Sequence, residues 1–148
     1  MKIEDEIDGR FRNEYHKGLI NLIYTTNQLH HDFLLSLKKH GLTSQQYNIL
    51  KVLRGFGKQP RSIEFLRYRM LDKNSDVSRV VDNLVSKGLI ERKENKSDRR
   101  QKDISITKKG LDLLKKMDEC EKNADSLLKN LSEEECRQLN ALLDKIRD

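Results

Sequence analysis

Three charged side chains near the middle of the chain, Asp98, Arg99 and Arg100, have the chemistry to bind a polyanion. They lie in ENKSDRRQKD (residues 94–103), ten residues without an apolar side chain. A guanidinium binds phosphate oxygens and is attracted to the negative potential of a narrow DNA minor groove. The carboxylate beside the two arginines can hold a guanidinium in a fixed, planar orientation. A solvated loop has the same composition, so the flanking elements must decide between the two interpretations.

Two short strand-like segments flank this stretch. LIERK (residues 89–93) precedes it, and DISIT (residues 103–107) follows, with Ile104 and Ile106 alternating with polar residues. Alternation of this kind is typical of a strand with one buried face. The two segments therefore predict a β-hairpin with a long, charged loop at its tip.

Two helices separated by a short turn are predicted before the hairpin. Ser62 can cap the first helix, and LDKNS (residues 71–75) breaks it, because Asp, Asn and Ser prefer turns and caps. The second helix is predicted to begin at Asn74 or Ser75 and to end at Gly88. A helix-turn-helix followed by a hairpin is a winged helix. In that arrangement the second helix enters the major groove of DNA, and the loop reaches an adjacent minor groove.

Longer helices are predicted on both sides of this module. Apolar side chains recur at helical spacing through residues 10–40, and further helices are predicted at 108–129 and 132–146. Capping boxes mark two helix starts: Thr43 with Gln46, and Ser132 with Glu135. A helix of about 30 residues spans roughly 45 Å, more than so small a module can cover. Pairing of the terminal helices with a second copy would bury their apolar stripes, and an exposed monomer is the alternative.

The positive charge of the chain is concentrated in its middle third. Residues 55–110 hold 15 Lys and Arg against 8 Asp and Glu, a net charge of +7, whereas the remaining chain has a net charge of −1. This asymmetry indicates a polyanionic partner for the middle of the chain. No stretch approaches the ~18 apolar residues of a membrane-spanning helix, and the first ten residues lack the apolar region of a secretory signal. We therefore expect a cytoplasmic protein without a membrane partner.

Four segments in this order resemble the MarR family of dimeric bacterial winged-helix regulators. LTSQQYNILKVL (residues 42–53) is similar to the family's opening of the DNA-binding lobe, and SDVSRVVDNLVSKGLIER (residues 75–92) to its recognition helix and first wing strand. SDRRQKDISITKKG (residues 97–110) resembles the wing tip, second strand and following helix start, and LSEEECRQLNALLDKI (residues 131–146) the closing dimer helix. The resemblance implies a fold that is mainly α with a small β-hairpin wing: a winged helix-turn-helix plus terminal dimerisation helices.

The resemblance also implies roles for individual residues. The wing carboxylate falls on Asp98, the groove-entering arginine on Arg100, and a phosphate contact on Arg99. Recognition-helix contacts fall on Ser75, Asp76, Ser78, Arg79 and Asn83. Asp76 stands where a small hydroxyl residue is more usual in the family, and it either accepts from a cytosine amino group or stabilises the helix N-terminus. Lys93, Lys96 and Lys102 are either phosphate contacts or ordinary solvated lysines.

The remaining reactive side chains give weaker signals. Tyr15, His30 and Tyr47 are candidate pocket residues, because rings with polar tips suit aromatic acids or phenols. Cys120 and Cys136 form no metal-ligand or disulfide pattern, and whether either senses redox state is open. No metal cluster, cofactor motif or catalytic constellation is visible, so we expect neither a cofactor nor an enzyme.

These observations together predict a homodimeric, sequence-specific DNA-binding transcriptional regulator. The resemblance implies a ligand-responsive repressor that binds a pseudo-palindromic operator, and a small aromatic or phenolic molecule is the expected effector. We assign residues 1–40 and 111–148 to a helical dimerisation region and residues 41–110 to the DNA-binding lobe. The alternative is a winged-helix dimer that docks a protein partner, as an anti-regulator does, in place of DNA.

Overall fold

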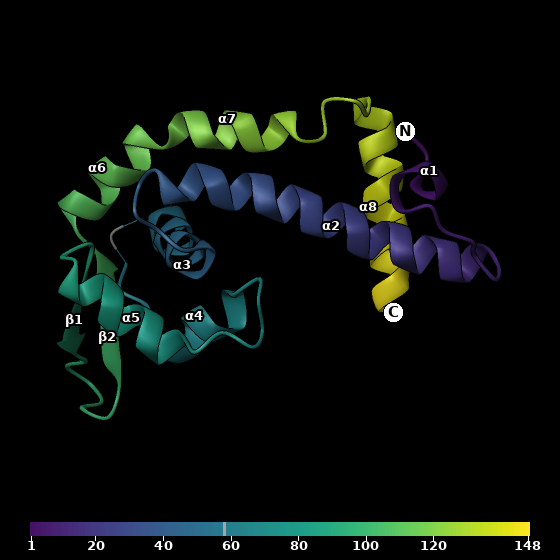
Figure 1. The fold of residues 1–148 in the computed structure, drawn as a ribbon. Coiled ribbons are helices and arrows are strands. Elements are labelled where there is room, and N and C mark those ends of the chain that lie inside the picture. Colours follow the sequence, from purple (N-terminus) through teal and green to yellow (C-terminus); the bar gives the residue numbers. More distant parts are fainter. Residues whose placement is uncertain (58) are drawn as a thin grey trace. The chain divides into compact units, whose positions relative to one another are not determined.

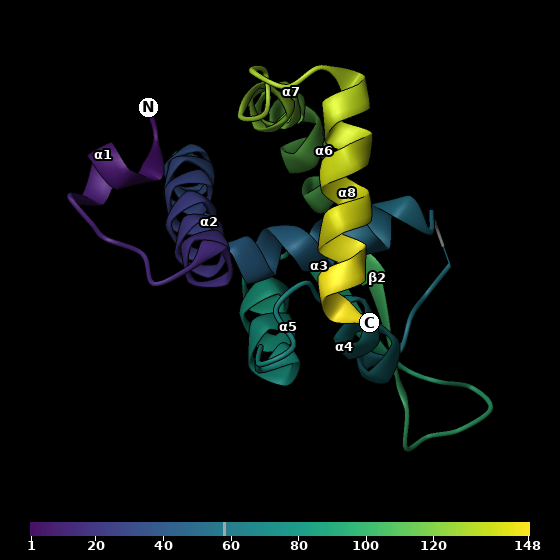
Figure 2. The ribbon, with the colours of Figure 1, turned by 90° about the vertical axis from the view of Figure 1, so that its right-hand side faces the viewer.

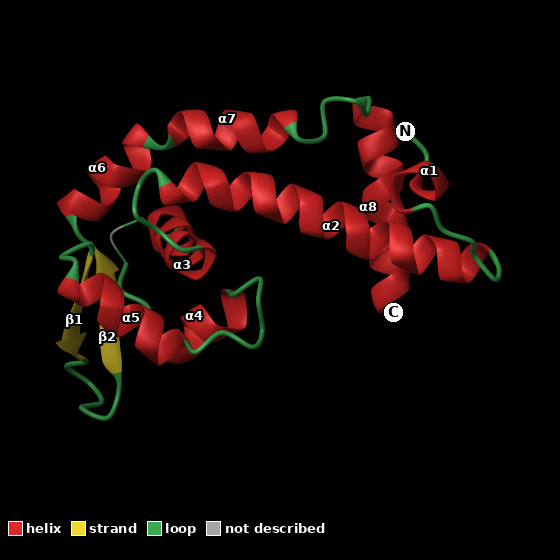
Figure 3. Cartoon of the chain, in the orientation of Figure 1, coloured by secondary structure: helices red, strands yellow, loops and turns green. Residues whose placement is uncertain are grey.

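The chain is mainly α-helical with a two-stranded antiparallel hairpin, as the sequence predicts (Figures 1 and 3). The computed structural model describes residues 1–57 and 59–148. The helices in this part are α1 (Ile3–Ile7), α2 (Glu14–Lys38), α3 (Ser44–Gly55), α4 (Ile63–Arg69), α5 (Val77–Ser86), α6 (Lys108–Lys116), α7 (Asp118–Ser126) and α8 (Glu133–Arg147), and the strands are β1 (Ile90–Glu94) and β2 (Lys102–Ile106). None of these helices combines the length and apolarity that a membrane crossing requires.

Residues 1–36 form one compact unit, which holds α1 and most of α2. Ile3 on α1 is buried, and the Lys17 ammonium of α2 lies 2.5 Å from the Glu4 carboxylate. The Tyr24 hydroxyl of α2 donates to the Glu6 carboxylate at 3.2 Å. These contacts hold α1 on α2, and α1 is an element that the sequence analysis did not predict.

Residues 37–148 form the second compact unit, and its core is centred on α3. This helix packs against α4, α5, α6 and β2. The side chains that are less than 2% exposed there include Ile49, Leu50, Leu53, Leu66, Val77, Val81, Leu84, Ile104, Leu114 and Met117. The helix-turn-helix, the hairpin and the start of α6 therefore share one core. The predicted division into lobe and dimerisation region at residues 40 and 111 stays a prediction.

The helix starts follow the predicted capping signals. The Thr43 hydroxyl accepts from the Gln46 backbone N–H at 3.2 Å, and the Gln46 side chain accepts from the Thr43 N–H at 3.1 Å. Ser132 and Glu135 form the same reciprocal pair, and Ser62 caps α4 as predicted. The capping boxes are confirmed, because each motif satisfies backbone donors that the first helical turn leaves unpaired.

The hairpin pairs Ile90 with Ile106 and Arg92 with Ile104 in antiparallel register. The backbone of Arg61, just before α4, extends this sheet by one bridge, since its N–H and C=O bond to Ile104 at 2.9 and 2.8 Å. The loop between the strands projects away from α4 and α5, as two perpendicular views show (Figures 1 and 2). The sheet therefore fixes the base of the loop in the core while its tip extends into solvent.

The junction between the end of α5 and the start of α6 is tightly packed. Gly88 ends the α5 segment at φ +70°, a conformation that favours glycine. Gly110 in α6 lies so close to this turn that a Cβ atom built there would be 2.3 Å from the Leu89 carbonyl oxygen. Position 110 therefore has no room for a side chain.

Two predicted boundaries are wrong. The helix predicted over residues 108–129 is interrupted at Met117, whose backbone leaves helical geometry at φ −93°, ψ 4°, and whose side chain is fully buried. The second helix of the helix-turn-helix begins at Val77 and not at Asn74 or Ser75, because Asp76 takes the capping position.

Candidate nucleic-acid interface

The N-terminus of α5 is stabilised by Asp76. Its Oδ1 accepts a hydrogen bond from the Arg79 backbone N–H at 3.2 Å, which makes it the N-cap of the helix. A carboxylate at this position also complements the positive end of the helix dipole. The structure thus gives Asp76 a structural role, and a base contact by the same carboxylate stays a prediction. The neighbouring Ser75 hydroxyl oxygen is buried and has no partner among the described residues, unlike the exposed residues that follow it.

The exposed face of α5 carries three of the predicted contact residues. Val77, Val81 and Leu84 face the core with at most 1% exposure, whereas Ser78, Arg79 and Asn83 are exposed. Within the described part of the chain, the Arg79 side chain forms no ion pair. The helix therefore presents a hydroxyl, a guanidinium and an amide to solvent, groups that can hydrogen-bond to phosphates and base edges.

The wing loop is ordered by hydrogen bonds from side chains to its own backbone. Asn95 Oδ1 accepts from the N–H groups of Ser97 and Asp98 at 2.8 and 2.9 Å, and its Nδ2 donates to Asp103 at 3.0 Å. The Gln101 N–H donates to the Asp98 carbonyl at 3.0 Å. Sequence reasoning missed Asn95, although an Asn two and three residues before the bonded amides is a recognised turn signal.

The proposed Asp98 clamp on an arginine side chain is absent from the described structure. Asp98 Oδ1 instead accepts from the backbone N–H of Arg100 at 2.9 Å. The carboxylate therefore shapes the loop backbone and leaves both neighbouring guanidinium groups free. A short local bond to a fixed amide is favoured here because it needs no ordering of a long, exposed side chain.

The cations of the wing differ in whether they form ion pairs. Lys93 pairs with Glu91 at 3.3 Å, and Lys102 pairs with Glu94 at 3.1 Å, both along the exposed strands. Within residues 1–57 and 59–148, the exposed side chains of three predicted contacts have no ion-pair partner, namely Lys96, Arg99 and Arg100. The tip of the wing thus concentrates unneutralised charge, while the strands hold compensated charge.

An ion pair joins the recognition helix to the wing. Arg92 on β1 lies 2.6 Å from Asp82 on the polar face of α5. Neither residue was predicted as part of the site, because they are ten positions apart and belong to different elements. Their contact helps to fix the angle between the two parts that would enter adjacent grooves.

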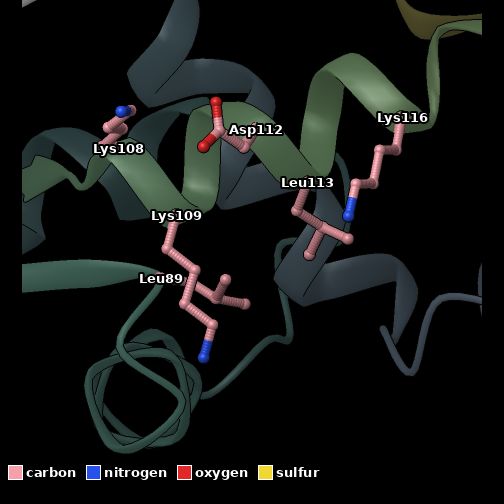
Figure 4. A pocket seen from close by; sticks show the side chains of 6 residues that line it. All are labelled: Leu89, Lys108, Lys109, Asp112, Leu113 and Lys116. Carbon is pink, nitrogen blue, oxygen red and sulfur yellow. The ribbon is translucent and has the colours of Figure 1, made fainter.

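The predicted effector residues lie in two different compact units. Tyr15 is 90% exposed and His30 is also exposed, both in the first compact unit, whereas Tyr47 is buried in the second. A different pocket lies beside α6 and is lined by Leu89, Lys108, Lys109, Asp112, Leu113 and Lys116 (Figure 4). The grouping of Tyr15, His30 and Tyr47 stays a prediction.

Cys136 is a free, half-buried thiol near the start of α8. The side chain of Cys120 lies outside the described residues. Among the residues that are described, no three His, Cys, Asp or Glu side chains are placed to hold a metal ion. The question of a redox role for either cysteine stays open.

Comparison with known proteins gives a consistent picture. A model of the MarR family matches residues 40–101. The HTH-type transcriptional regulator MhqR of Bacillus subtilis is 31% identical over 111 residues, which cover 74% of this chain and 75% of MhqR.

Solved structures agree with this fold over most of the chain. A complex of Staphylococcus aureus MepR with DNA is 25% identical, with a TM-score of 0.74 over 93% of this chain and 97% of MepR. The organohalide-sensing regulator RdhR, in a form bound to 2,4-dichlorophenol, is 19% identical, with a TM-score of 0.80 over 94% of this chain and 85% of that one. The likeness to RdhR is one of fold.

Proposed function

The chain belongs to the MarR family of transcriptional regulators, and on that premise we propose that it represses transcription as a homodimer bound to a pseudo-palindromic DNA site. The observation that carries the proposal is the wing tip, where Arg99 and Arg100 are exposed and form no ion pair with any described residue. Exposed guanidinium groups of this kind can enter a minor groove while α5 occupies the adjacent major groove. The relative MepR has been solved in complex with DNA, which supports the same partner here.

The proposal of a homodimer is supported by apolar side chains that one protomer leaves exposed. On α2, Leu19 is 57% and Ile23 is 50% exposed, and on α8, Leu142 is 61% and Ile146 is 68% exposed. Large apolar side chains at helical spacing on a surface favour a protein partner. A second copy is the economical partner, since two-fold symmetry then presents two recognition helices to successive major grooves of the operator.

The proposed effector is a small aromatic or phenolic molecule. Support comes from RdhR, which shares the fold and was solved with 2,4-dichlorophenol. An effector of this kind would act by binding one spacing of the two DNA-binding lobes better than the other, so that the DNA-competent form is depleted.

The test begins with selection of bound sequences from random duplex DNA, followed by titration of the selected site with the full-length protein. We expect tight binding with a log–log salt slope of roughly −6 to −9, as neutralisation of about 6–10 phosphates per dimer requires. A flat salt response would contradict the electrostatic argument. The absence of a mobility shift even at low salt would favour a protein partner over DNA.

Substitution of Arg100 by Ala tests the wing itself. If the guanidinium reads the minor groove, each half-site should lose about 1–3 kcal/mol of binding free energy, measured by fluorescence anisotropy. Lys129→Ala, an exposed cation between α7 and α8, is the matched control and should leave affinity near that of the wild type. Equal affinity of the Arg100 variant and the control would remove the wing from the mechanism.

A further inference from the structure

Lys87, the residue directly after α5, connects the recognition helix to the start of the lobe. Its ammonium donates to the Gly41 carbonyl at 2.8 Å and to Gln46 Oε1 at 3.3 Å. Gly41 follows the end of α2, and Gln46 lies in the first turn of α3. One side chain thus ties the C-terminal end of α5 to the α2–α3 junction, across more than 40 positions of sequence.

The main chain at the same point is held from the opposite side. The Lys109 ammonium of α6 donates to the Lys87 carbonyl at 2.9 Å, and the Thr107 hydroxyl donates to the Gly88 carbonyl at 2.7 Å. Figure 4 shows the Lys109 side chain extending from α6 past Leu89. The two carbonyls that follow α5 therefore have donors from the hairpin–α6 junction, while the Lys87 side chain reaches the α2–α3 junction.

The acceptor on the α3 side is fixed in place. Gln46 is the buried polar residue of the described core, at 6% exposure, and its Oε1 also accepts from the Thr43 N–H in the capping box. An ammonium bonded to such an acceptor cannot shift without loss of a defined contact. The second ammonium, that of Lys109, is also favoured near the C-terminal end of α5, because the terminal carbonyls of a helix carry a partial negative charge.

A small shift at the Lys87 end of α5 moves the contact residues by a larger distance, because they lie at the other end of the helix. A helix of ten residues is about 15 Å long, so a tilt of about 5° at one end moves the other end by roughly 1 Å. Hydrogen bonds to base edges and phosphates tolerate only a few tenths of an ångström. Ser78 and Arg79 lie at the end of α5 opposite Lys87, where such a tilt has its largest effect.

We propose that Lys87 is a positioning residue for DNA recognition: it sets the angle of α5 through Gly41 and Gln46 and contacts no phosphate itself. The proposal rests on the DNA-binding function proposed above. It distinguishes Lys87 from Arg79, Lys96, Arg99 and Arg100, whose charged groups form no ion pair within the described residues. The ammonium of Lys87 donates to two protein acceptors, whereas the charged groups of the other four residues are available to a polyanion.

Lys87→Met in the full-length chain tests the proposal, with titration of the selected DNA site at four or more salt concentrations. We expect affinity to fall about tenfold while the log–log salt slope stays that of the wild type, because the number of neutralised phosphates is unchanged. Lys87→Arg, which keeps a cationic donor, should recover most of the lost affinity. A slope that becomes shallower by about two per dimer would overturn the proposal, since it would reveal a direct phosphate contact in each protomer.

Lys115→Met is the matched control, because it removes the same charge from an exposed position on α6. Its affinity should stay within about twofold of the wild type, and a loss equal to that of Lys87→Met would reduce the effect to net charge and overturn the proposal.

Gln46→Leu removes an acceptor and keeps every charge, so it should weaken binding with an unchanged slope. Combined with Lys87→Met it should cost less than the sum of the single effects, and strict additivity would contradict the connection.

Failure of this inference is distinguishable from failure of the proposed function. If the wild-type protein binds no DNA, the function proposal fails before any variant is measured. If the wild type binds and Lys87→Met binds equally well, only the positioning role is lost. Circular dichroism and urea unfolding of each variant identify any loss of folded protein, and Lys87→Arg and Gln46→Leu provide the same test where Lys87→Met is unfolded.

Discussion

The lobe centred on α3 and the closing helix α8 begin from the same sequence pattern and reach opposite burial. Ile49 and Leu50 of α3 have no exposed surface, whereas Leu142 and Ile146 of α8 are 61% and 68% exposed. Both helices start with a capping box and both carry an apolar stripe. An apolar stripe therefore predicts that a helix needs a surface to pack against, but not where that surface lies: α3 packs its stripe inside the lobe, whereas Leu142 and Ile146 of α8 stay exposed among the described residues.

The largest expected effect is the loss of a buried side chain from the lobe. Leu53 is 1% exposed at the centre of α3. Leu53→Ala should lower the free energy of unfolding by about 2–5 kcal/mol, because it removes buried methyl groups and leaves a cavity. Urea unfolding followed by circular dichroism measures this change. Leu128→Ala, at a side chain between α7 and α8 that is 40% exposed, should cost less than about 1 kcal/mol, and a similar loss at both sites would contradict the contrast between buried and exposed apolar positions.

A smaller effect, of a different kind, is expected for α8. The double variant Leu142→Glu/Ile146→Glu places two charges on the exposed apolar face. It should raise the dissociation constant of the proposed homodimer at least tenfold, which corresponds to about 1.4 kcal/mol. Sedimentation velocity across a range of protein concentrations measures the shift from dimer to monomer. Gln138→Glu adds a charge to α8 at an exposed polar position and is the control. An unchanged sedimentation coefficient in the double variant would exclude this face from the interface.

The smallest effect concerns the start of α8. The backbone N–H and the hydroxyl of Ser132 both donate to the Glu135 carboxylate, at 2.8 and 2.9 Å, and they lower the pKa of that carboxyl from its ordinary value of 4.5. Because the folded-state pKa is the lower one, the cap is fully effective above pH 4.5 and is lost as the pH falls through the lowered pKa. The amide resonance of Ser132 should therefore shift in an acid titration by NMR. In Glu135→Gln, which cannot titrate, the same resonance should lose that transition.

The parts of the fold that sequence predicted well depend on signals within a few residues. Thr43 and Gln46, or Gly41 and Gly88, determine a helix end by their own chemistry, whatever the rest of the chain does. The break at Met117 has no such signal. No Gly or Pro stands there, and only the packed environment of its buried side chain marks the end of α6. The five-residue helix α1 is too short for periodicity to detect.

The candidate site likewise divides into features that sequence predicted and features that it did not. Sequence placed Arg99 and Arg100 on an exposed hairpin loop, since polar composition between two strands predicts both features. The bond from the Arg100 backbone N–H to Asp98 was not predicted, because a motif states which residues are neighbours and not which backbone N–H each carboxylate will meet. Asn95, which organises the loop, and the Arg92–Asp82 pair were missed for the same reason.

Gly110 is the point at which α6 packs most tightly against the turn after α5, among the glycines that the structure describes. Its missing side chain lets α6 approach the Leu89 carbonyl, and a single methyl group there would collide with main-chain oxygen, which cannot move aside as a flexible side chain can. Gly110→Ala would thus force α6 away from the turn that follows α5 without any change of charge.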